Sequence, residues 1–105
     1  MDKKTDPKIV NFLNEVNKEF KLVRVILFGS RARADYFISS DYDIILVSPD
    51  FKNFNFHERI SEVYKYWNEE EDLEPLCYTP EEFEKKSRQI CIVSKAIEEG
   101  IEIKL

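Results

Sequence analysis

The sequence has little histidine or cysteine, with one His and two Cys among 105 residues. A zinc site built on histidines or a Ser-His-Asp triad therefore has too few candidate residues. Cys77 and Cys91 are far from a C-x-x-C spacing and are too few for a disulfide framework, which favours reduced thiols in a cytoplasmic protein. His57 is interpreted as an exposed residue in the first turn of a helix.

Long apolar runs and an excess of basic residues are also missing. No apolar stretch approaches the roughly 20 residues that span a bilayer, and the first residues, MDKKTDPK, lack the apolar region of a signal peptide. We therefore expect a cytoplasmic protein without a membrane segment. The formal net charge of −5 also disfavours duplex nucleic acid as a partner, because that ligand requires clustered Lys and Arg. A nucleotide stays compatible with this charge, since a triphosphate arrives with magnesium.

The chain does contain enough apolar residues for one core, at 43% of the sequence. Apolar spacing predicts the following order of elements: a helix over 7–20, a strand over 22–28, a short helix over 30–36, a strand over 41–47, a helix over 56–70, a strand over 73–78, a helix over 80–100 and an edge strand over 101–105. We expect a single α/β domain over residues 1–105. Its core would be a small twisted mixed sheet of three to four strands with helices packed against it.

The helix expected over 80–100 has signals at both ends. Thr79 is a suitable N-cap, Pro80 suits the first helical position, and Glu82 follows the cap by three residues. Gly100 is a typical residue for the end of a helix. The pattern predicts one continuous helix between them.

A glycine and a serine follow the first buried strand. Only two glycines occur in the chain, and Gly29 lies where the backbone must turn sharply and could approach a phosphate. Ser30 opens the next short helix, where a hydroxyl and free backbone N–H groups can bind an anion. The pair predicts a phosphate-binding turn.

Two carboxylates open the next predicted strand. Asp41 and Asp43 are two residues apart, so in a strand their side chains leave the same face. Two neighbouring carboxylates repel each other unless a cation lies between them, and magnesium prefers such oxygen ligands. Either motif alone is commonly a turn or a solvated strand edge, but together they form G-S-x(10)-D-x-D between a turn and a strand. This combination predicts a magnesium site beside a phosphate-binding turn.

The run LFGSRARADYFISSDYDIILV resembles the signature of the DNA polymerase beta-like nucleotidyltransferase superfamily, and most closely its minimal nucleotidyltransferase family. The segment LEPLCYTPEEFEKK is similar to the third strand and following helix of that group. By position, the family's metal ligands fall on Asp41 and Asp43, and its phosphate-binding residues on Gly29 and Ser30.

The resemblance also implies a third carboxylate on the next strand. That position is Glu74, where the family usually has Asp, and Asp72 is the alternative because it has the same strand parity. Ala34 stands where the family normally has Gly. Arg31 and Arg33 are candidates to neutralise the phosphates, although a structural ion pair on the domain surface is the other interpretation of each.

The implied activity is two-metal nucleotidyl transfer, with AMP passing from Mg-ATP to a hydroxyl acceptor and two Mg²⁺ ions in the active complex. Members of this family commonly pair, as antitoxins, with a HEPN-domain toxin that they can modify. A HEPN-type partner or a homo-oligomer would have to supply the acceptor-binding surface. The alternative is a nucleotide-binding module with weak or no catalysis that regulates a partner by contact.

Phe37 and Ile38 lie between the predicted short helix and Asp41. Two adjacent large apolar residues in a loop beside an active site predict a contact surface, and the alternative is that one of them folds under the short helix.

Overall fold

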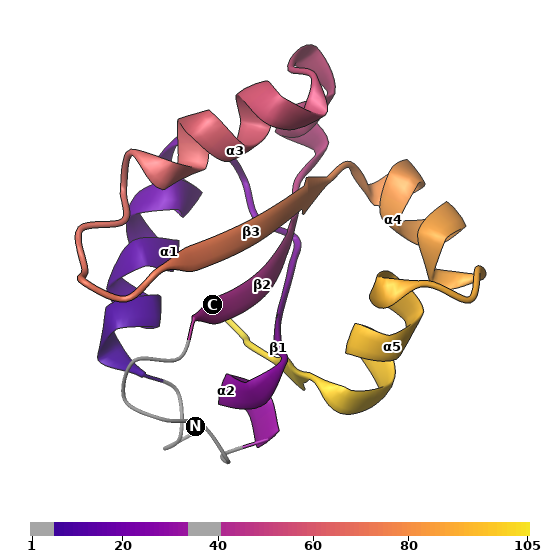
Figure 1. The fold of residues 1–105 in the computed structure, drawn as a ribbon. Helices are drawn as coiled ribbons and strands as arrows, with labels where there is room; N and C mark the ends of the chain where they lie inside the picture. The colour runs from indigo at the N-terminus through magenta and orange to yellow at the C-terminus, as the bar shows by residue number, and fades with distance from the viewer. Residues whose placement is uncertain (1–5, 34–40) are drawn as a thin grey trace.

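The computed structural model of the protein describes residues 6–33 and 41–105, which form a four-stranded mixed sheet with helices on both faces (Figure 1). The elements in chain order are α1 (Pro7–Glu19), β1 (Arg24–Phe28), α2 (Ser30–Arg33), β2 (Tyr42–Val47), the 3-10 helix η1 (Pro49–Asn53), α3 (Phe56–Tyr64), β3 (Leu73–Tyr78), α4 (Pro80–Ser87), α5 (Ile92–Glu99) and β4 (Ile101–Glu102). The predicted fold class is confirmed. Phe37 and Ile38 lie outside the described residues, so the contact surface expected there stays a prediction.

The sheet has the strand order β3-β2-β1-β4. β2 runs parallel to β3, whereas β1 is antiparallel to both β2 and β4. The four residues of β2 from Ile44 to Val47 are all buried, as expected for a continuous apolar run covered on both faces. β2 therefore contributes buried side chains to both faces of the sheet.

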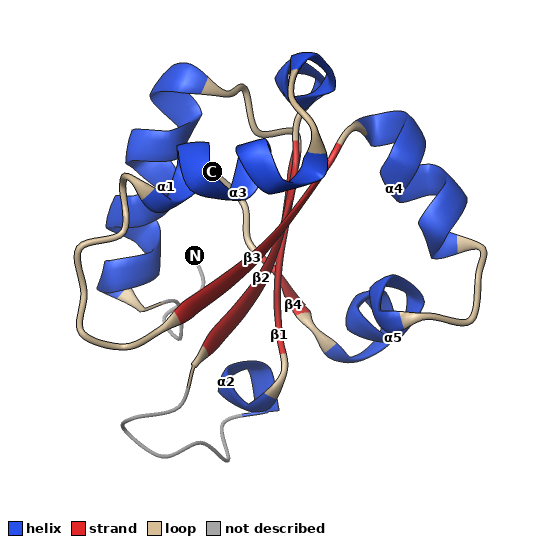
Figure 2. Cartoon of the chain, turned by 45° about the horizontal axis from the view of Figure 1, so that its top comes forward, coloured by secondary structure: helices blue, strands red, loops and turns tan. Residues whose placement is uncertain are grey.

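Each face of the sheet has its own helices (Figure 2). Side chains alternate along a strand, and Ile44 and Leu46 belong to the core cluster that includes residues of α1 and α3. Ile45 and Val47 point the other way and pack with residues of α4 and α5. Asp43 has the parity of Ile45, so its side chain leaves the sheet on the α4/α5 face.

The prediction of one continuous helix over 80–100 is wrong, because the chain turns between α4 and α5. The N-cap was predicted correctly: the Thr79 hydroxyl accepts from the Glu82 N–H, and the Glu82 carboxylate accepts from the Thr79 N–H. The break allows two short helices to bury Phe83 and Val93 against the same sheet face. A straight helix of about 20 residues would be roughly 30 Å long and would carry one end past the sheet. Ile90 lies in the turn between the two helices and is fully exposed.

The helix predicted over 56–70 is shorter than expected and ends at Tyr64. Trp67 follows it, is buried, and donates its indole N–H to the Glu71 carbonyl at 2.7 Å. Tyr64, the last residue of the helix, is 37% exposed. His57 is exposed in the first turn of α3, as predicted. In residues 6–33 and 41–105, no helix is long and apolar enough to cross a membrane.

Arg59 joins α3, η1, β3 and α4 from a buried position, with 6% of its surface exposed. Its guanidinium donates to three backbone carbonyls and to one carboxylate; these acceptors are Phe51 O at 2.8 Å, Phe54 O at 2.9 Å, Cys77 O at 3.1 Å and Glu82 Oε1 at 2.6 Å. The hydrogen bond from Arg59 lowers the pKa of Glu82 below its usual value. A buried charge with this many partners fixes the mutual positions of the four elements.

Candidate active site

Two of the three predicted acidic residues lie side by side on neighbouring strands. Asp43 is the register partner of Glu74 in the parallel β2–β3 pair and of Phe28 in the antiparallel β1–β2 pair. Residues paired in this way direct their side chains to the same face of the sheet. Asp41 directly precedes β2, and it interacts electrostatically with both Asp43 and Glu74. The structure therefore brings Asp41, Asp43 and Glu74 together at the α4/α5 face, where β2 and β3 begin.

The pKa values of Asp43 and Glu74 are both raised above those of ordinary carboxyl groups. For Asp43 the main cause is partial burial, and repulsion by Asp41 comes second, while a hydrogen bond with Glu74 acts in the opposite direction. For Glu74 the main cause is again burial, followed by repulsion from Asp43 and a hydrogen bond with Asp41. In both groups burial contributes more to the raised pKa than the repulsion between the carboxylates does.

This set of side chains fits a divalent cation such as magnesium. All three donors are carboxylate oxygens, the ligands that magnesium prefers, and a cation among them would replace mutual repulsion by attraction. Within 6–33 and 41–105, no group of three or more His, Cys, Asp or Glu residues is arranged so that it could hold a metal ion as it stands. Metal binding would thus need the carboxylates to turn from one another's hydrogen bonds towards the ion.

Gly29 follows β1 and has a positive φ of 74°, the backbone region that favours glycine. A Cβ atom added at this position would collide with the Asp43 carboxylate. Gly29 thus meets two requirements at once: it turns the chain from β1 into α2, and it leaves room for Asp43. The backbone at Gly29 lies directly against a proposed metal ligand.

Gly29→Ala is expected to lower both stability and nucleotide affinity. A non-glycine residue in the left-handed region costs about 1–3 kcal/mol, and the added methyl group must displace the Asp43 side chain. Thermal unfolding and calorimetric titration with Mg-ATP measure the two effects. Gly100→Ala is the control, because its Cβ would crowd Ala96, Ile26 and Leu27, and it should reduce stability alone. Equal Mg-ATP affinities for both variants and the wild type would contradict the role given to Gly29.

Arg31, which was expected to face the phosphates, is held elsewhere in the structure. It is 9% exposed, and its guanidinium lies over the Tyr42 ring, 4.0 Å from the centroid. Tyr42 alternates with Asp43 and belongs to the cluster on the α1/α3 face, where its hydroxyl donates to Asp6. Arg31 therefore supports the Tyr42 ring and lies on the side of the sheet opposite to Asp43.

The structure places the remaining predicted residues as follows. Ser30 and Arg33 are the first and last residues of α2. The structure does not describe the side chains of these two residues, so their phosphate contacts stay predictions. Glu74 is the residue that β3 pairs with Asp43, whereas Asp72 precedes the strand. Cys77 is fully buried, and burial raises the pKa of its thiol to about 12, so this residue packs in the core.

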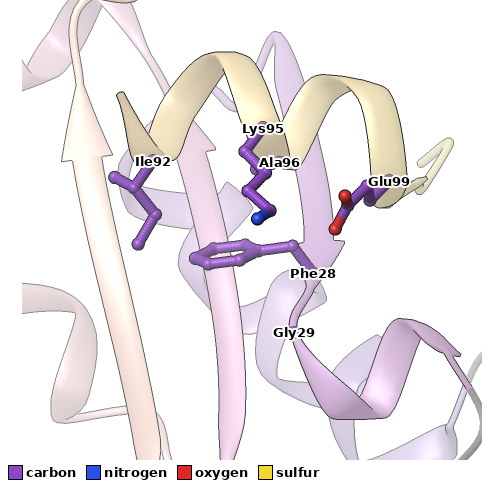
Figure 3. Close-up of a pocket in the computed structure, with 6 residues that line it drawn as sticks. All are labelled: Phe28, Gly29, Ile92, Lys95, Ala96 and Glu99. Carbon is purple, nitrogen blue, oxygen red and sulfur yellow. The ribbon is translucent and has the colours of Figure 1, made fainter. Parts of the chain in front are cut away.

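A cavity of about 150 Å³ opens between α5 and the end of β1 (Figure 3). It is lined by Phe28, Gly29, Ile92, Lys95, Ala96 and Glu99. Because Phe28 pairs with Asp43, the cavity is on the same sheet face as the carboxylates and next to them. The sequence patterns did not single out Lys95 or Glu99. Both lie in a helix with several charged residues, and only their closeness to Gly29 in the folded chain marks them as candidate site residues.

Comparisons with known proteins identify the family of this chain. The model of the nucleotidyltransferase domain family matches residues 9–99. A Methanocaldococcus jannaschii protein named "Putative protein adenylyltransferase" is 26% identical over 104 residues, an alignment that covers 91% of this chain and 99% of that protein.

Solved structures extend the comparison. A "putative nucleotidyltransferase" from Sulfolobus solfataricus is 25% identical, with a TM-score of 0.64 over 90% of this chain and 75% of that one. BolA1 from Arabidopsis thaliana is 19% identical, with a TM-score of 0.58 over 74% of this chain and 98% of that one, a likeness of fold alone. The family match includes Gly29 and all three carboxylates, and it confirms the resemblance that the sequence motifs carried. This chain belongs to the nucleotidyltransferase domain family, as a member of the minimal nucleotidyltransferase type.

Proposed function

We propose that this protein transfers AMP from Mg-ATP to a hydroxyl group on a partner protein. Its family supplies the reaction class, and the name of the Methanocaldococcus jannaschii relative supplies the nucleotide and the class of acceptor. The observation that carries the proposal is the position of Asp41, Asp43 and Glu74 on one sheet face, directly beside Gly29.

Each residue of the site has a distinct task in this proposal. Asp41, Asp43 and Glu74 would hold two Mg²⁺ ions, and Gly29 would let the backbone approach the phosphates, with Ser30 next to it. The bound magnesium supplies charge neutralisation for the triphosphate and for the departing pyrophosphate. Arg33 is proposed to contact the phosphates. Arg31 is a second candidate for this role, and its guanidinium lies over the Tyr42 ring in the structure.

The transfer itself is an in-line displacement at the α-phosphorus. The acceptor oxygen forms a bond to this phosphorus while the bond to the oxygen bridging the α- and β-phosphates breaks, and pyrophosphate leaves with the electron pair. Glu74 is proposed to accept the hydroxyl proton, because its carboxylate is exposed at the open edge of the group, where an acceptor hydroxyl can reach it. In this proposal Glu74 would therefore both help to hold magnesium and receive the proton.

The acceptor in this proposal is a HEPN-domain protein, so that the transfer gives the chain an antitoxin role. This assignment rests on the resemblance to the minimal nucleotidyltransferases and on the protein-modifying relative. A purely regulatory module would share the same site but would not transfer a label.

Radiolabelled ATP tests the proposed reaction. The protein is incubated with magnesium, a HEPN-domain protein from the same genome, and ATP labelled at either the α- or the γ-phosphate. We expect magnesium-dependent labelling of the acceptor from α-labelled ATP alone, because the β- and γ-phosphates leave as pyrophosphate. Label from γ-labelled ATP would indicate phosphorylation instead. Binding of Mg-ATP without any transfer would support the regulatory alternative.

A further inference from the structure

The cavity between α5 and β1 contains a cation that the proposed mechanism does not use. In Figure 3 the Lys95 side chain extends from α5 towards the Phe28 side chain, with which it lines the cavity. Gly29 is the next residue along the chain and lines the same cavity. A space of about 150 Å³ can hold a group as large as a benzene ring, so a phosphate group fits.

Lys95 is not engaged in an ion pair with the other described residues. Three ion pairs between described residues have helical spacing, two of them i,i+3 and one i,i+4. None of these three pairs includes Lys95. Glu99 is one turn further along α5, but a lysine that precedes its glutamate has the weaker orientation for a helical pair. The ammonium group is therefore available to a ligand in the cavity.

The charge of the site makes such a cation important. Asp41, Asp43 and Glu74 are close together, and a triphosphate adds further negative charge beside them. The guanidinium of Arg31 is over Tyr42, on the opposite face of the sheet. Lys95 approaches from the α5 side, on the face shared by Phe28 and Asp43.

We propose that Lys95 binds the pyrophosphate part of the nucleoside triphosphate in the cavity between α5 and Gly29. This inference rests on the proposed function. Lys95 is then a substrate-binding residue that contributes from a helix far along the chain, and its positive charge also stabilises the pyrophosphate as it leaves. Glu99 lines the same cavity, and its negative charge opposes the phosphates.

Binding measurements with two probes test this assignment. Calorimetric titration with Mg-ATP, and competition by magnesium pyrophosphate, are carried out on the wild type, Lys95→Ala, Glu99→Gln and Lys85→Ala. We expect Lys95→Ala to weaken both probes about tenfold or more, since a hydrogen bond to a charged group is lost. Glu99→Gln should strengthen both. Lys85 is an exposed residue of α4, so its substitution makes the same charge change and should have little effect.

The outcomes separate this inference from the proposed function. Wild-type affinity in Lys95→Ala, or equal weakening in Lys95→Ala and Lys85→Ala, would overturn the role of Lys95 while leaving the transfer reaction intact. Weaker ATP binding with unchanged pyrophosphate binding would also overturn it, because the contact would then be with the nucleoside. If the wild type bound neither probe, both proposals would fail. Lys95 is exposed, so its substitution should leave the melting temperature equal to that of the wild type. Equal melting temperatures then show that the variants are folded.

Discussion

Asp43→Asn is expected to abolish magnesium-dependent binding of ATP while the protein stays folded. The amide keeps the shape of the carboxylate but loses the negative charge that a hard divalent cation requires. Loss of a residue that only orients a metal ligand costs about 10–100-fold in metal affinity, so loss of a ligand should cost more than that. Isothermal titration with Mg-ATP measures the effect. Asp50→Asn is the control, because its amide oxygen can still accept from the Lys21 N–H and it lies beyond the other end of β2.

The stability of Asp43→Asn gives a second, independent readout. The pKa of Asp43 is raised in the folded protein, so the folded state binds this proton more tightly than the unfolded chain does. Its contribution to stability is then present below the unfolded pKa, near 3.8, and is lost as the pH rises through the folded value. At neutral pH the variant should be at least as stable as the wild type. A clear loss of stability at pH 7, or an unchanged affinity for Mg-ATP, would contradict the metal role.

Arg59→Met is expected to cause the largest loss of stability, about 3 kcal/mol or more. Methionine retains much of the buried aliphatic volume, but it leaves the carbonyls of Phe51, Phe54 and Cys77 without their donor and removes the partner of Glu82. Small domains have a total stability of only about 5–15 kcal/mol, so much of the variant could unfold at physiological temperature. Urea denaturation followed by circular dichroism measures the difference.

A surface arginine provides the matched comparison. Arg88 pairs with Glu84 at 3.5 Å, and both side chains are exposed. Such pairs contribute about 0–1 kcal/mol, so Arg88→Met should change stability little. The pKa of Glu82 is lowered in the folded protein, so the stability that this group adds is lost as the pH falls through its folded value, below about 4.5. Arg59→Met should lose this part of the acid dependence, and similar losses in both arginine variants would rule out the proposed network.

Local patterns predicted the fold well where short-range physics decides the outcome. The apolar run of β2 and the cap at Thr79 depend on neighbours in sequence, and both occur as predicted. The break between α4 and α5 was missed, because the apolar residues keep helical spacing across it. Such spacing does not reveal the point at which a straight helix would extend beyond the sheet. Arg59 was also missed, since an arginine in an amphipathic helix ordinarily faces solvent, and its acceptors come from residues 8 and 18 positions away.

In the candidate site, too, residues marked by local sequence spacing were predicted, and those that depend on distant contacts were not. Asp41, Asp43 and Gly29 were identifiable because their spacing is itself the signal, and the β2–β3 register favoured Glu74 over Asp72. The orientation of Arg31 could not be read from sequence, because it depends on Tyr42 offering a ring on the other face. Lys95 is 66 residues away from Gly29, and only the folded chain brings the two to one cavity.

The pairing of β1 with β4 sets the order in which this chain can complete its sheet during synthesis. Ile26 and Leu27 pair with Glu102 and Ile101, which emerge from the ribosome long after β1, β2 and β3. Until then one edge of β1 keeps its backbone groups unpaired next to the apolar side chains of Val25 to Leu27, an arrangement that promotes association between nascent chains. The two residues of β4 can cover this edge only after they have left the ribosome, so they protect the folded domain from edge-to-edge association, whereas the growing chain lacks this protection.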